Sequence, residues 1–359
     1  MSSPQHYRNL SLPTGTETLQ LHEAARHRRI TRALDDLFSQ WGYDPAETAL
    51  VDYFDVYRRL LSDEDIQHMY RAVDRQGEIL TLRADTTLFL AKQLGLHLTD
   101  DDLPVRVFYA DQIVRAEDRH DISNNEYQQA GIELVGVQGP EGDAEVLFLA
   151  VEALGALHLT DAVIHVGSHA LTAACAEHIG IETAQLGDLL RRREFHNPEL
   201  AELDPSLRRL AEFIGPQSDF EALIDQIATT APRVAAAGDE LVTVVKLLQE
   251  IVPEEWRDRI RIDVSELGAY HYYTGIAFSA YIPDSNAAIL RGGRYDRLLQ
   301  AFGFDAPSVG FSLFTRKLPA TVFETDATEH APEVARGDTL AARIADARRQ
   351  HSQRKRAHV

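Results

Sequence analysis

The sequence predicts an α+β fold in which an antiparallel sheet is flanked by helices. Residues 79–83, 126–137 and 276–281 have side chains that alternate in polarity with a period of two, which is typical of strands. Residues 17–41 have apolar side chains at helical spacing instead. Residues 169–256 contain several further helical patterns and few strand signals. Antiparallel strands with helices packed on them form one of the few layered arrangements that bury a single core.

The N-terminal third predicts one long helix, three short strands and a second helix. Apolar residues of the 17–41 segment, among them Leu34 and Trp41, lie on one helical face, and Gly42 ends the pattern. The expected strands cover 50–54, 70–74 and 79–83, and the expected second helix covers 86–94. Residues 75–78 read Arg-Gln-Gly-Glu, which favours a hairpin turn between the last two strands.

The middle of the chain predicts two long strands and then a helical region. The strands cover 105–117 and 126–137, and a helix follows at 141–157. From residue 169 onward helical segments are broken at Asn197-Pro198, Asp204-Pro205 and Gly215-Pro216. We therefore expect a core domain at 1–318 that contains a helical insertion at 168–257.

Strand character returns after the expected insertion and completes the sheet. The predicted strands cover 261–264, 276–281 and 287–290, and the predicted helices cover 295–301 and 309–317. The last segment, 319–359, has no strand signal and predicts a helical or disordered tail.

Composition limits the classes of function. The chain has 359 residues, of which 44% are hydrophobic, so it can bury a sizeable core. Its 36 basic and 56 acidic residues give a net charge of −20, which disfavours general RNA binding. One cysteine excludes a disulfide within the chain and suits a cytoplasmic location. No run of about 18 apolar residues and no signal-peptide pattern is present, so we expect neither membrane insertion nor secretion.

Metal and cofactor motifs are weak. His165 and His169 have the spacing of helical metal ligands, but Gly167 intervenes and no convincing third ligand follows. The chain lacks a Walker loop, a Rossmann glycine fingerprint and a Gly-x-Ser-x-Gly elbow. We therefore predict no metal and no cofactor.

Side-chain alternation predicts a specialised face of the sheet. Gln129, Gly131 and Glu133 share one face, opposite the apolar residues between them. The same separation occurs in residues 81–85, where the polar face ends at Asp85, and in residues 275–280. A small ligand with an amine and a carboxylate would fit such a face. Alternatively, it is the solvated side of an antiparallel sheet. The glycine between Gln129 and Glu133 favours a pocket, because it leaves room for a ligand.

Four ordered blocks resemble the core of histidyl-tRNA synthetase, a class II aminoacyl-tRNA synthetase. They are residues 82–87 (Leu-Arg-Ala-Asp-Thr-Thr), 115–136, 271–275 (His-Tyr-Tyr-Thr-Gly) and 291–296 (Arg-Gly-Gly-Arg-Tyr-Asp). The resemblance covers about residues 15–318 and implies the class II antiparallel sheet with a helical insertion. The anticodon-binding domain of these enzymes needs about a hundred residues or more. The 319–359 segment is too short for it, so the resemblance implies a core without that domain.

The resemblance also implies a histidine pocket. Asp85 matches the carboxylate that binds the α-amino group of histidine, and Arg115 matches the arginine of motif 2. The residues of the predicted pocket are Asp85, Thr87, Arg115, Gln129, Glu133, Tyr272 and Tyr273.

The segments that handle phosphate in this family depart from its pattern. Gly268 stands where the catalytic arginine is expected, and residues 123–127 (Ser-Asn-Asn-Glu-Tyr) lack the arginine of the motif 2 loop. In motif 3, Phe314 replaces a glycine and Lys317 an arginine, and lysine cannot reproduce bidentate phosphate recognition. The loss of one such contact typically costs about a hundredfold in rate. We therefore expect that adenylation activity is lost.

A synthetase core with a histidine pocket and a damaged adenylation site resembles the regulatory-subunit family of bacterial ATP phosphoribosyltransferase. This resemblance implies a non-catalytic, cytoplasmic protein that partners the short catalytic subunit in the first step of histidine biosynthesis. It also implies a homodimer within a hetero-oligomer and L-histidine as a feedback effector. Whether histidine binds in the old synthetase pocket or at a subunit interface stays open.

Two alternatives belong to other classes. A truncated ligase would adenylate histidine or another small acid through Arg115 and Lys317. A tRNA-binding sensor would use the basic residues of the tail, but the net charge of −20 makes tRNA an unlikely partner.

Overall fold

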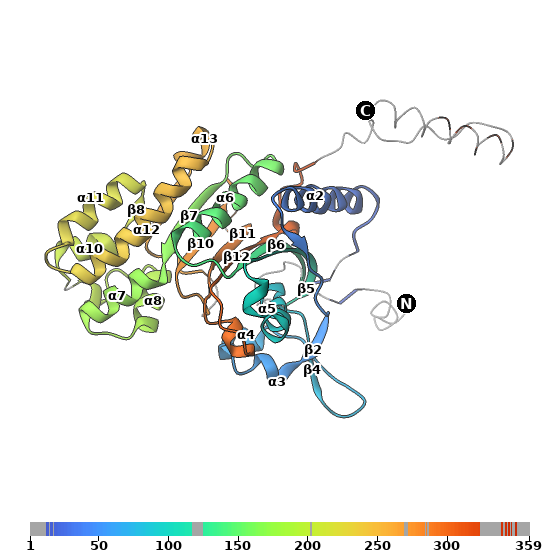
Figure 1. Ribbon diagram of the computed structural model, residues 1–359, viewed down its shortest axis with the longest axis horizontal. Helices are drawn as coiled ribbons and strands as arrows, with labels where there is room; N and C mark the ends of the chain where they lie inside the picture. Colours follow the sequence, from blue (N-terminus) through green and yellow to red (C-terminus); the bar gives the residue numbers. More distant parts are fainter. Residues whose placement is uncertain are drawn as a thin grey trace, which may run out of the picture.

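The computed structural model describes residues 12–323, apart from 14, 17, 117–124, 202, 269–271, 284 and 286, together with residues 339, 342, 344, 346 and 349. Its centre is a nine-stranded sheet, and a separate three-stranded sheet lies below it in the view of Figure 1. Helices cover the large sheet and extend to one side of it. No helix among the described residues is long and apolar enough to cross a membrane.

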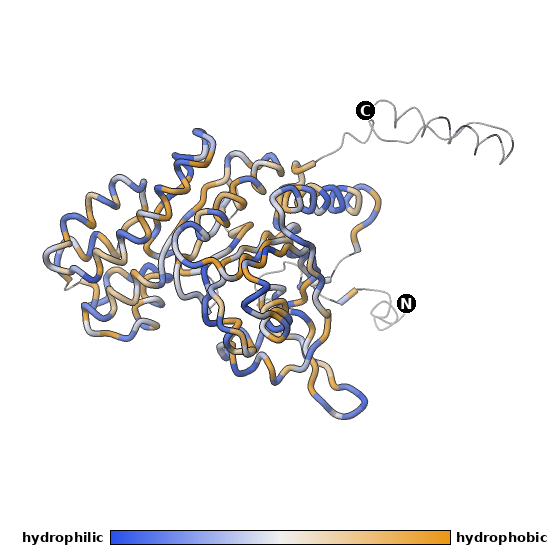
Figure 2. Tube along the Cα trace, viewed as in Figure 1, coloured by the Kyte–Doolittle hydropathy of each residue, from blue (hydrophilic) through white to orange (hydrophobic). Residues whose placement is uncertain are grey.

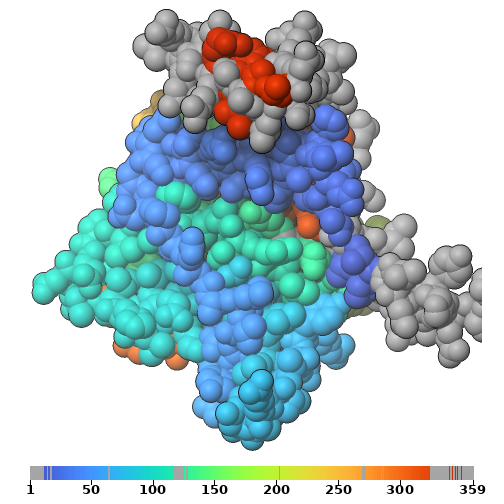
Figure 3. Space-filling view, turned by 90° about the vertical axis from the view of Figure 1, so that its right-hand side faces the viewer, coloured from blue at the N-terminus to red at the C-terminus, as the bar shows by residue number. Residues whose placement is uncertain are grey.

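The first long helix is α2, Leu21–Gln40. Its buried side chains Ile30, Leu34 and Phe38 recur every four residues, so they form one stripe that packs on the core. Gly42 has a φ of +79° just beyond the helix, a conformation that glycine adopts without strain. The helix predicted at 17–41 is confirmed as α2, which covers residues 21–40 of that range. In Figure 3, α2 lies across the upper part of the molecular face that is turned to the viewer.

The three strands predicted near residues 50–83 form the small sheet. Its order is β2 (Val51–Tyr53), β4 (Ile79–Leu82) and β3 (Arg71–Val73), and both pairings are antiparallel. The hairpin of β3 and β4 projects at the bottom of Figure 1. Helix α5, Thr86–His97, begins four residues after β4 ends and confirms the second predicted helix.

The large sheet is antiparallel except for two of its strand pairs. Its order is β1 (Asp44–Pro45), β5 (Val105–Val114), β6 (Glu126–Val135), β12 (Ser308–Phe314), β11 (Leu290–Arg294), β10 (Ile276–Tyr281), β7 (Val163–Ser168), β9 (Ile260–Asp263) and β8 (Ile214–Gly215). The pairs β1·β5 and β7·β9 are parallel. The predicted α+β class, a sheet flanked by helices, is confirmed.

Three predictions after residue 157 are wrong in detail. The segment predicted as a helix at 309–317 is mainly β12, a central strand whose seven residues are all buried. A strand that is covered on both faces shows no polar alternation, so its pattern resembles that of a buried helix. Strand β7 was not predicted, and β11 begins where the strand predicted at 287–290 ends. Only a 3₁₀ turn, Leu299–Phe302, overlaps the helix predicted at 295–301.

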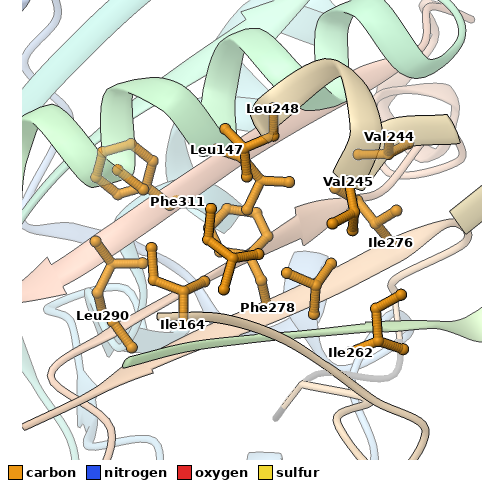
Figure 4. Packing of buried hydrophobic residues seen from close by; sticks show 14 of the residues in the cluster. Leu147, Ile164, Val244, Val245, Leu248, Ile262, Ile276, Phe278, Leu290 and Phe311 are labelled. Atoms are coloured by element: carbon orange, nitrogen blue, oxygen red, sulfur yellow. The ribbon is translucent and has the colours of Figure 1, made fainter. Parts of the chain in front are cut away.

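One face of the large sheet is packed against helices α2, α6 (Pro140–Ala156) and α12 (Pro232–Ile251). Figure 4 shows how this layer closes: Leu147 of α6 and Val245 and Leu248 of α12 meet Ile276 and Phe278 of β10. All five side chains belong to one buried cluster. This face of the sheet is therefore apolar and excludes water, so a polar site would lie on the opposite face.

The region after β7 is mainly helical, as predicted for 168–257. Its helices are α7 (His169–Ile179), α8 (Thr183–Arg191), α9 (Pro198–Ala201), α10 (Pro205–Ala211), α11 (Gln217–Ile227), α12 and α13 (Glu254–Arg257). Pro198 and Pro205 begin α9 and α10, because proline suits the first turn of a helix. Hydrophilic and hydrophobic turns alternate along these helices in Figure 2. The division into a core and an insertion stays a prediction.

Short elements complete the chain. They are α3 (Phe54–Tyr57), α4 (Asp63–Gln67) and the 3₁₀ turns η1 (Asp100–Asp102), η2 (Leu299–Phe302) and η3 (Thr315–Lys317).

Candidate functional site

The two faces of strand β6 differ in polarity, as the alternation of its side chains predicts. Ala130, Ile132 and Leu134 belong to the helix-covered core. Gln129 and Glu133 point to the other face, where they are 0% and 2% exposed. Because both are buried, the interpretation of this part of the sheet as a solvated face is wrong. Buried polar groups require partners, and those partners define the site.

The start of α5 is fastened to β6 through Asp85 and Gln129. Asp85 is the N-cap residue of α5, and one of its carboxylate oxygens accepts a hydrogen bond from the Leu88 N–H at 2.9 Å. Its other oxygen accepts from Gln129 Nε2 at 3.3 Å, while the Gln129 carbonyl oxygen accepts from the Thr86 N–H at 2.9 Å. The position of the Asp85 carboxylate is thus fixed by a helix terminus and by a central strand.

Glu133 lies deeper and is surrounded by hydroxyl groups. The Thr87 hydroxyl donates to it at 2.6 Å and the Tyr109 hydroxyl at 3.3 Å. The Tyr295 hydroxyl donates to its other oxygen. Burial raises the pKa of Glu133 to about 8, and these hydrogen bonds oppose part of that rise. The Glu133 carboxyl group therefore keeps its proton to a higher pH than an exposed glutamate does.

A small cavity lies between these groups, and it is closed in this structure. It is lined by Asp85, Thr87, Gln129, Tyr272, Tyr273, Arg291, Tyr295, Gly310, Phe311, Ser312 and Phe314. Its volume open to a water-sized sphere is about 10 Å³, which suits roughly one water molecule. The rings of Tyr272 and Tyr273 lie 5.1 Å apart, and Tyr272 lies 5.8 Å from Tyr295. A free amino acid could enter only if this wall moved.

Six of the seven predicted site residues lie together. Asp85, Thr87, Gln129, Tyr272 and Tyr273 line the cavity, and Glu133 bonds to one of them. Arg115 is not among the described residues that line it. Its guanidinium lies 3.7 Å from Asp65 of α4, and its backbone N–H donates to Asn125. The binding roles of all seven residues stay predictions.

Sequence reasoning missed four residues of the site. Tyr109 and Ser312 are linked through their hydroxyl groups at 2.7 Å, and Tyr295 bonds to Glu133. Arg291 lines the cavity from β11. Tyr109 pairs with Gly131 across the sheet, so the absence of a side chain at Gly131 was a signal for a large partner. An added Cβ at Gly131 would lie 2.0 Å from the Phe311 carbonyl oxygen and 2.8 Å from the Tyr109 hydroxyl. The prediction that this glycine leaves room for a ligand is therefore wrong, because the neighbouring strand and the tyrosine fill that space.

The residues that align with the phosphate-binding segments of the synthetases make other contacts in this structure. Gly268 has a φ of +66°, and an added Cβ there would lie 2.6 Å from the Tyr273 ring. A side chain at this position would be strained and crowded. Lys317 places its Nζ 5.1 Å from the centre of the Phe314 ring. Residues 123 and 124 and His271 lie outside the described residues. The described site can accept hydrogen bonds from an amine, but it presents few cations to a polyphosphate.

Comparisons with known proteins agree with this geometry. The sequence model of the family described as "Histidyl-tRNA synthetase" matches residues 15–318. An "ATP phosphoribosyltransferase regulatory subunit" of Moorella thermoacetica is 31% identical over 320 residues, which cover 86% of this chain and 81% of that protein. The protein of the same name from Ectopseudomonas mendocina is 32% identical, with 84% and 78% covered.

Solved structures show the same fold. The crystal structure of an "ATP phosphoribosyltransferase regulatory subunit/histidyl-tRNA synthetase" from Bacillus halodurans matches with a TM-score of 0.75 at 23% identity, covering 85% of this chain and 81% of that one. A histidyl-tRNA synthetase from Nostoc matches with a TM-score of 0.71 at 20% identity, with 86% and 74% covered. From the family model and the sequence relatives together, the chain belongs to the histidyl-tRNA synthetase-like family of ATP phosphoribosyltransferase regulatory subunits.

Proposed function

We propose that this chain is a non-catalytic regulatory subunit that assembles with the short catalytic subunit of ATP phosphoribosyltransferase and serves the first step of histidine biosynthesis. Its relatives carry the name of that regulatory subunit over most of the chain. In this proposal L-histidine binds in the cavity between β6, β12 and α5 and shifts the complex toward an inhibited state. A cytoplasmic location fits this role.

The observation that carries the ligand assignment is the fixed carboxylate of Asp85. This side chain is 4% exposed and lines the cavity, so a ligand ammonium that reaches it would be desolvated and held by charge-assisted hydrogen bonds. Three tyrosines, Tyr272, Tyr273 and Tyr295, also line the cavity, and their hydroxyl groups are the proposed partners of the imidazole nitrogens. The pocket thus offers groups for both polar ends of histidine.

Loss of adenylation is part of the proposal. Lys317 lies over the Phe314 ring, Gly268 carries no side chain, and Arg115 lies beside Asp65. Stabilisation of a pentavalent phosphorus requires several positioned cations. The competing function, a small ligase, predicts histidine-dependent exchange of pyrophosphate into ATP by the purified chain. We expect no exchange above background, and measurable exchange would favour the ligase.

A second copy of the chain is the proposed homodimer partner, and the small sheet offers a surface for it. Val73, Tyr53 and Ile79 are 71%, 54% and 46% exposed, which is unusual for apolar strand residues. The variant Val73→Asp should lower the mass measured by light scattering from that of a dimer toward that of a monomer. The matched change Ile251→Asp, at an exposed apolar residue of α12, should leave the mass unchanged.

Activation of the catalytic partner is the decisive test. The short catalytic subunit should gain activity when this chain is added, and histidine should reverse the gain. Calorimetric titration of histidine into Asp85→Asn should show a loss of affinity of tenfold or more, since asparagine keeps the helix cap but removes the charge. An unchanged affinity would place histidine elsewhere, for example at a subunit interface. No effect on the catalytic subunit would refute the regulatory role itself.

A further inference from the structure

A bound α-amino acid also presents an α-carboxylate, and the groups named so far are partners for its amine and its imidazole only. Gly268 stands where the resemblance to synthetases places a catalytic arginine, and it has no side chain. Among the described residues that line the closed cavity, Arg291 is the one cationic side chain.

Arg291 lies at the boundary between the closed cavity and a wide neighbouring cleft of about 610 Å³. The cleft is lined by His165, Arg191, Arg193, Asp263, Ser265, Glu266, Leu267, Gly268, Ser279, Tyr281 and Arg291. In the sheet, Arg291 pairs with Ser312 on one side and with Ser279 on the other. Ser312 lines the cavity and Ser279 lines the cleft. Directly paired residues share a face of the sheet, so the arginine crosses from one space to the other between two small neighbours.

The other charged groups of the cleft are already engaged. Asp263 accepts a hydrogen bond from the Arg193 guanidinium at 3.2 Å and lies 2.9 Å from Nδ1 of His165. Glu266 accepts from the Gly268 N–H and from the Tyr281 hydroxyl, both at 3.1 Å.

Arg291 differs from these groups. Within the described part of the chain, its guanidinium forms no hydrogen bond and no ion pair. A half-buried arginine beside a small polar cavity, with no hydrogen bond to a described residue and only an electrostatic interaction with Tyr281, is positioned to receive an anion.

We propose that Arg291 binds the α-carboxylate of the amino acid held in the cavity, at the boundary with the cleft. This inference rests on the proposed function, because it takes the ligand to be an α-amino acid whose ammonium is at Asp85. Arg291 then selects ligands that carry both charges. An amine without a carboxylate, such as histamine, gains nothing from Arg291.

Calorimetric titrations of the full chain test this assignment, with Arg291→Gln, Arg291→Lys and the matched control Arg191→Gln. Arg191 lines the same cleft but not the cavity, and it is paired with Asp188 at 2.7 Å. We expect Arg291→Gln to weaken histidine binding about tenfold or more, and Arg191→Gln to change it less than about threefold. Arg291→Lys should fall between wild type and Arg291→Gln, because it keeps the charge without the planar fork. The melting temperature of Arg291→Gln should stay within about 2 °C of wild type, because the change removes no hydrogen bond and no ion pair to a residue that the structure describes.

Two further ligands separate the possible outcomes. Histamine should bind wild type and Arg291→Gln equally, and an equal loss of histamine and histidine affinity would overturn the carboxylate assignment. If inorganic phosphate competed with histidine only when Arg291 was present, while histidine affinity itself was unchanged by Arg291→Gln, the arginine would serve a phosphate and the proposal would fail. Wild type that binds no histidine would overturn the proposed effector together with this inference. Wild type that binds, with Arg291→Gln unchanged, would overturn the inference alone.

Discussion

The site has two parts that are held in different ways. The residues that align with the histidine pocket of the synthetases are called the amino-acid side here, and those that align with their phosphate contacts are called the phosphate side. On the amino-acid side, Asp85 and Gln129 are linked to each other and to a helix terminus, and Glu133 is held by three hydroxyl groups. On the phosphate side, Arg115 lies beside Asp65 and the position aligned with a catalytic arginine is Gly268. Under the proposed function, the difference teaches that recognition of an amino acid and its activation are separable. The first depends on sheet register, and the second depends on a few cations.

The largest expected effect concerns the pH dependence of the amino-acid side. Glu133 has a pKa of about 8 in the folded chain against 4.5 in the unfolded chain. Below pH 4.5 both states hold the proton, so the stability is fully present. As the pH rises from 4.5 to 8, only the unfolded state releases the proton, and the free energy of unfolding falls by on the order of 4 kcal/mol. Denaturant titrations should show that Glu133→Gln removes this decline, and parallel pH profiles for the two proteins would contradict it.

The next effect breaks the register that holds the amino-acid side together. Gly131→Val would force a side chain against the Tyr109 hydroxyl, so we expect a loss of about 3 kcal/mol in the free energy of unfolding. Histidine binding should disappear with it. The control is Gly155→Ala in α6, where an added Cβ meets nothing within 4 Å. That change should stabilise by up to about 1 kcal/mol, because alanine favours a helix.

A smaller effect tests whether one cation restores the phosphate side. Gly268→Arg should cost about 2 kcal/mol, since the position has a φ of +66° and faces the Tyr273 ring. It should not restore pyrophosphate exchange, because the other phosphate contacts stay absent. Gly42→Ala, at a φ of +79° with open space around it, measures the backbone cost alone. Recovery of exchange by Gly268→Arg would mean that activation was lost through this position only.

The smallest expected effect sharpens the boundary between the two sides. Arg115→Gln should change histidine affinity by less than about twofold, because Arg115 does not line the cavity and lies beside Asp65. Asp85→Asn, measured by the same calorimetry, serves as the positive reference. A loss for Arg115→Gln comparable to that for Asp85→Asn would place Arg115 in the binding site after all.

The sequence predicts which residues lie on the polar face of a strand better than it predicts which of these residues meet in the site. Alternation along β6 placed Gln129 and Glu133 together because one face of that strand is apolar and the other is not. It could not identify β12, whose two faces are both buried, as a strand. Nor could it find Arg291, whose role depends on the cross-strand neighbours Ser279 and Ser312 and therefore on a register that connects distant segments. Local patterns report which side of a strand is polar, whereas the register decides which polar groups meet.

The closed volume of the cavity has a kinetic consequence. A space of about 10 Å³ cannot receive an amino acid until some of the residues that line it have moved. The observed rate of ligand association should then rise with effector concentration and level off at the rate of opening. Under the proposed function, inhibition after a sudden rise in histidine would begin no faster than the cavity opens.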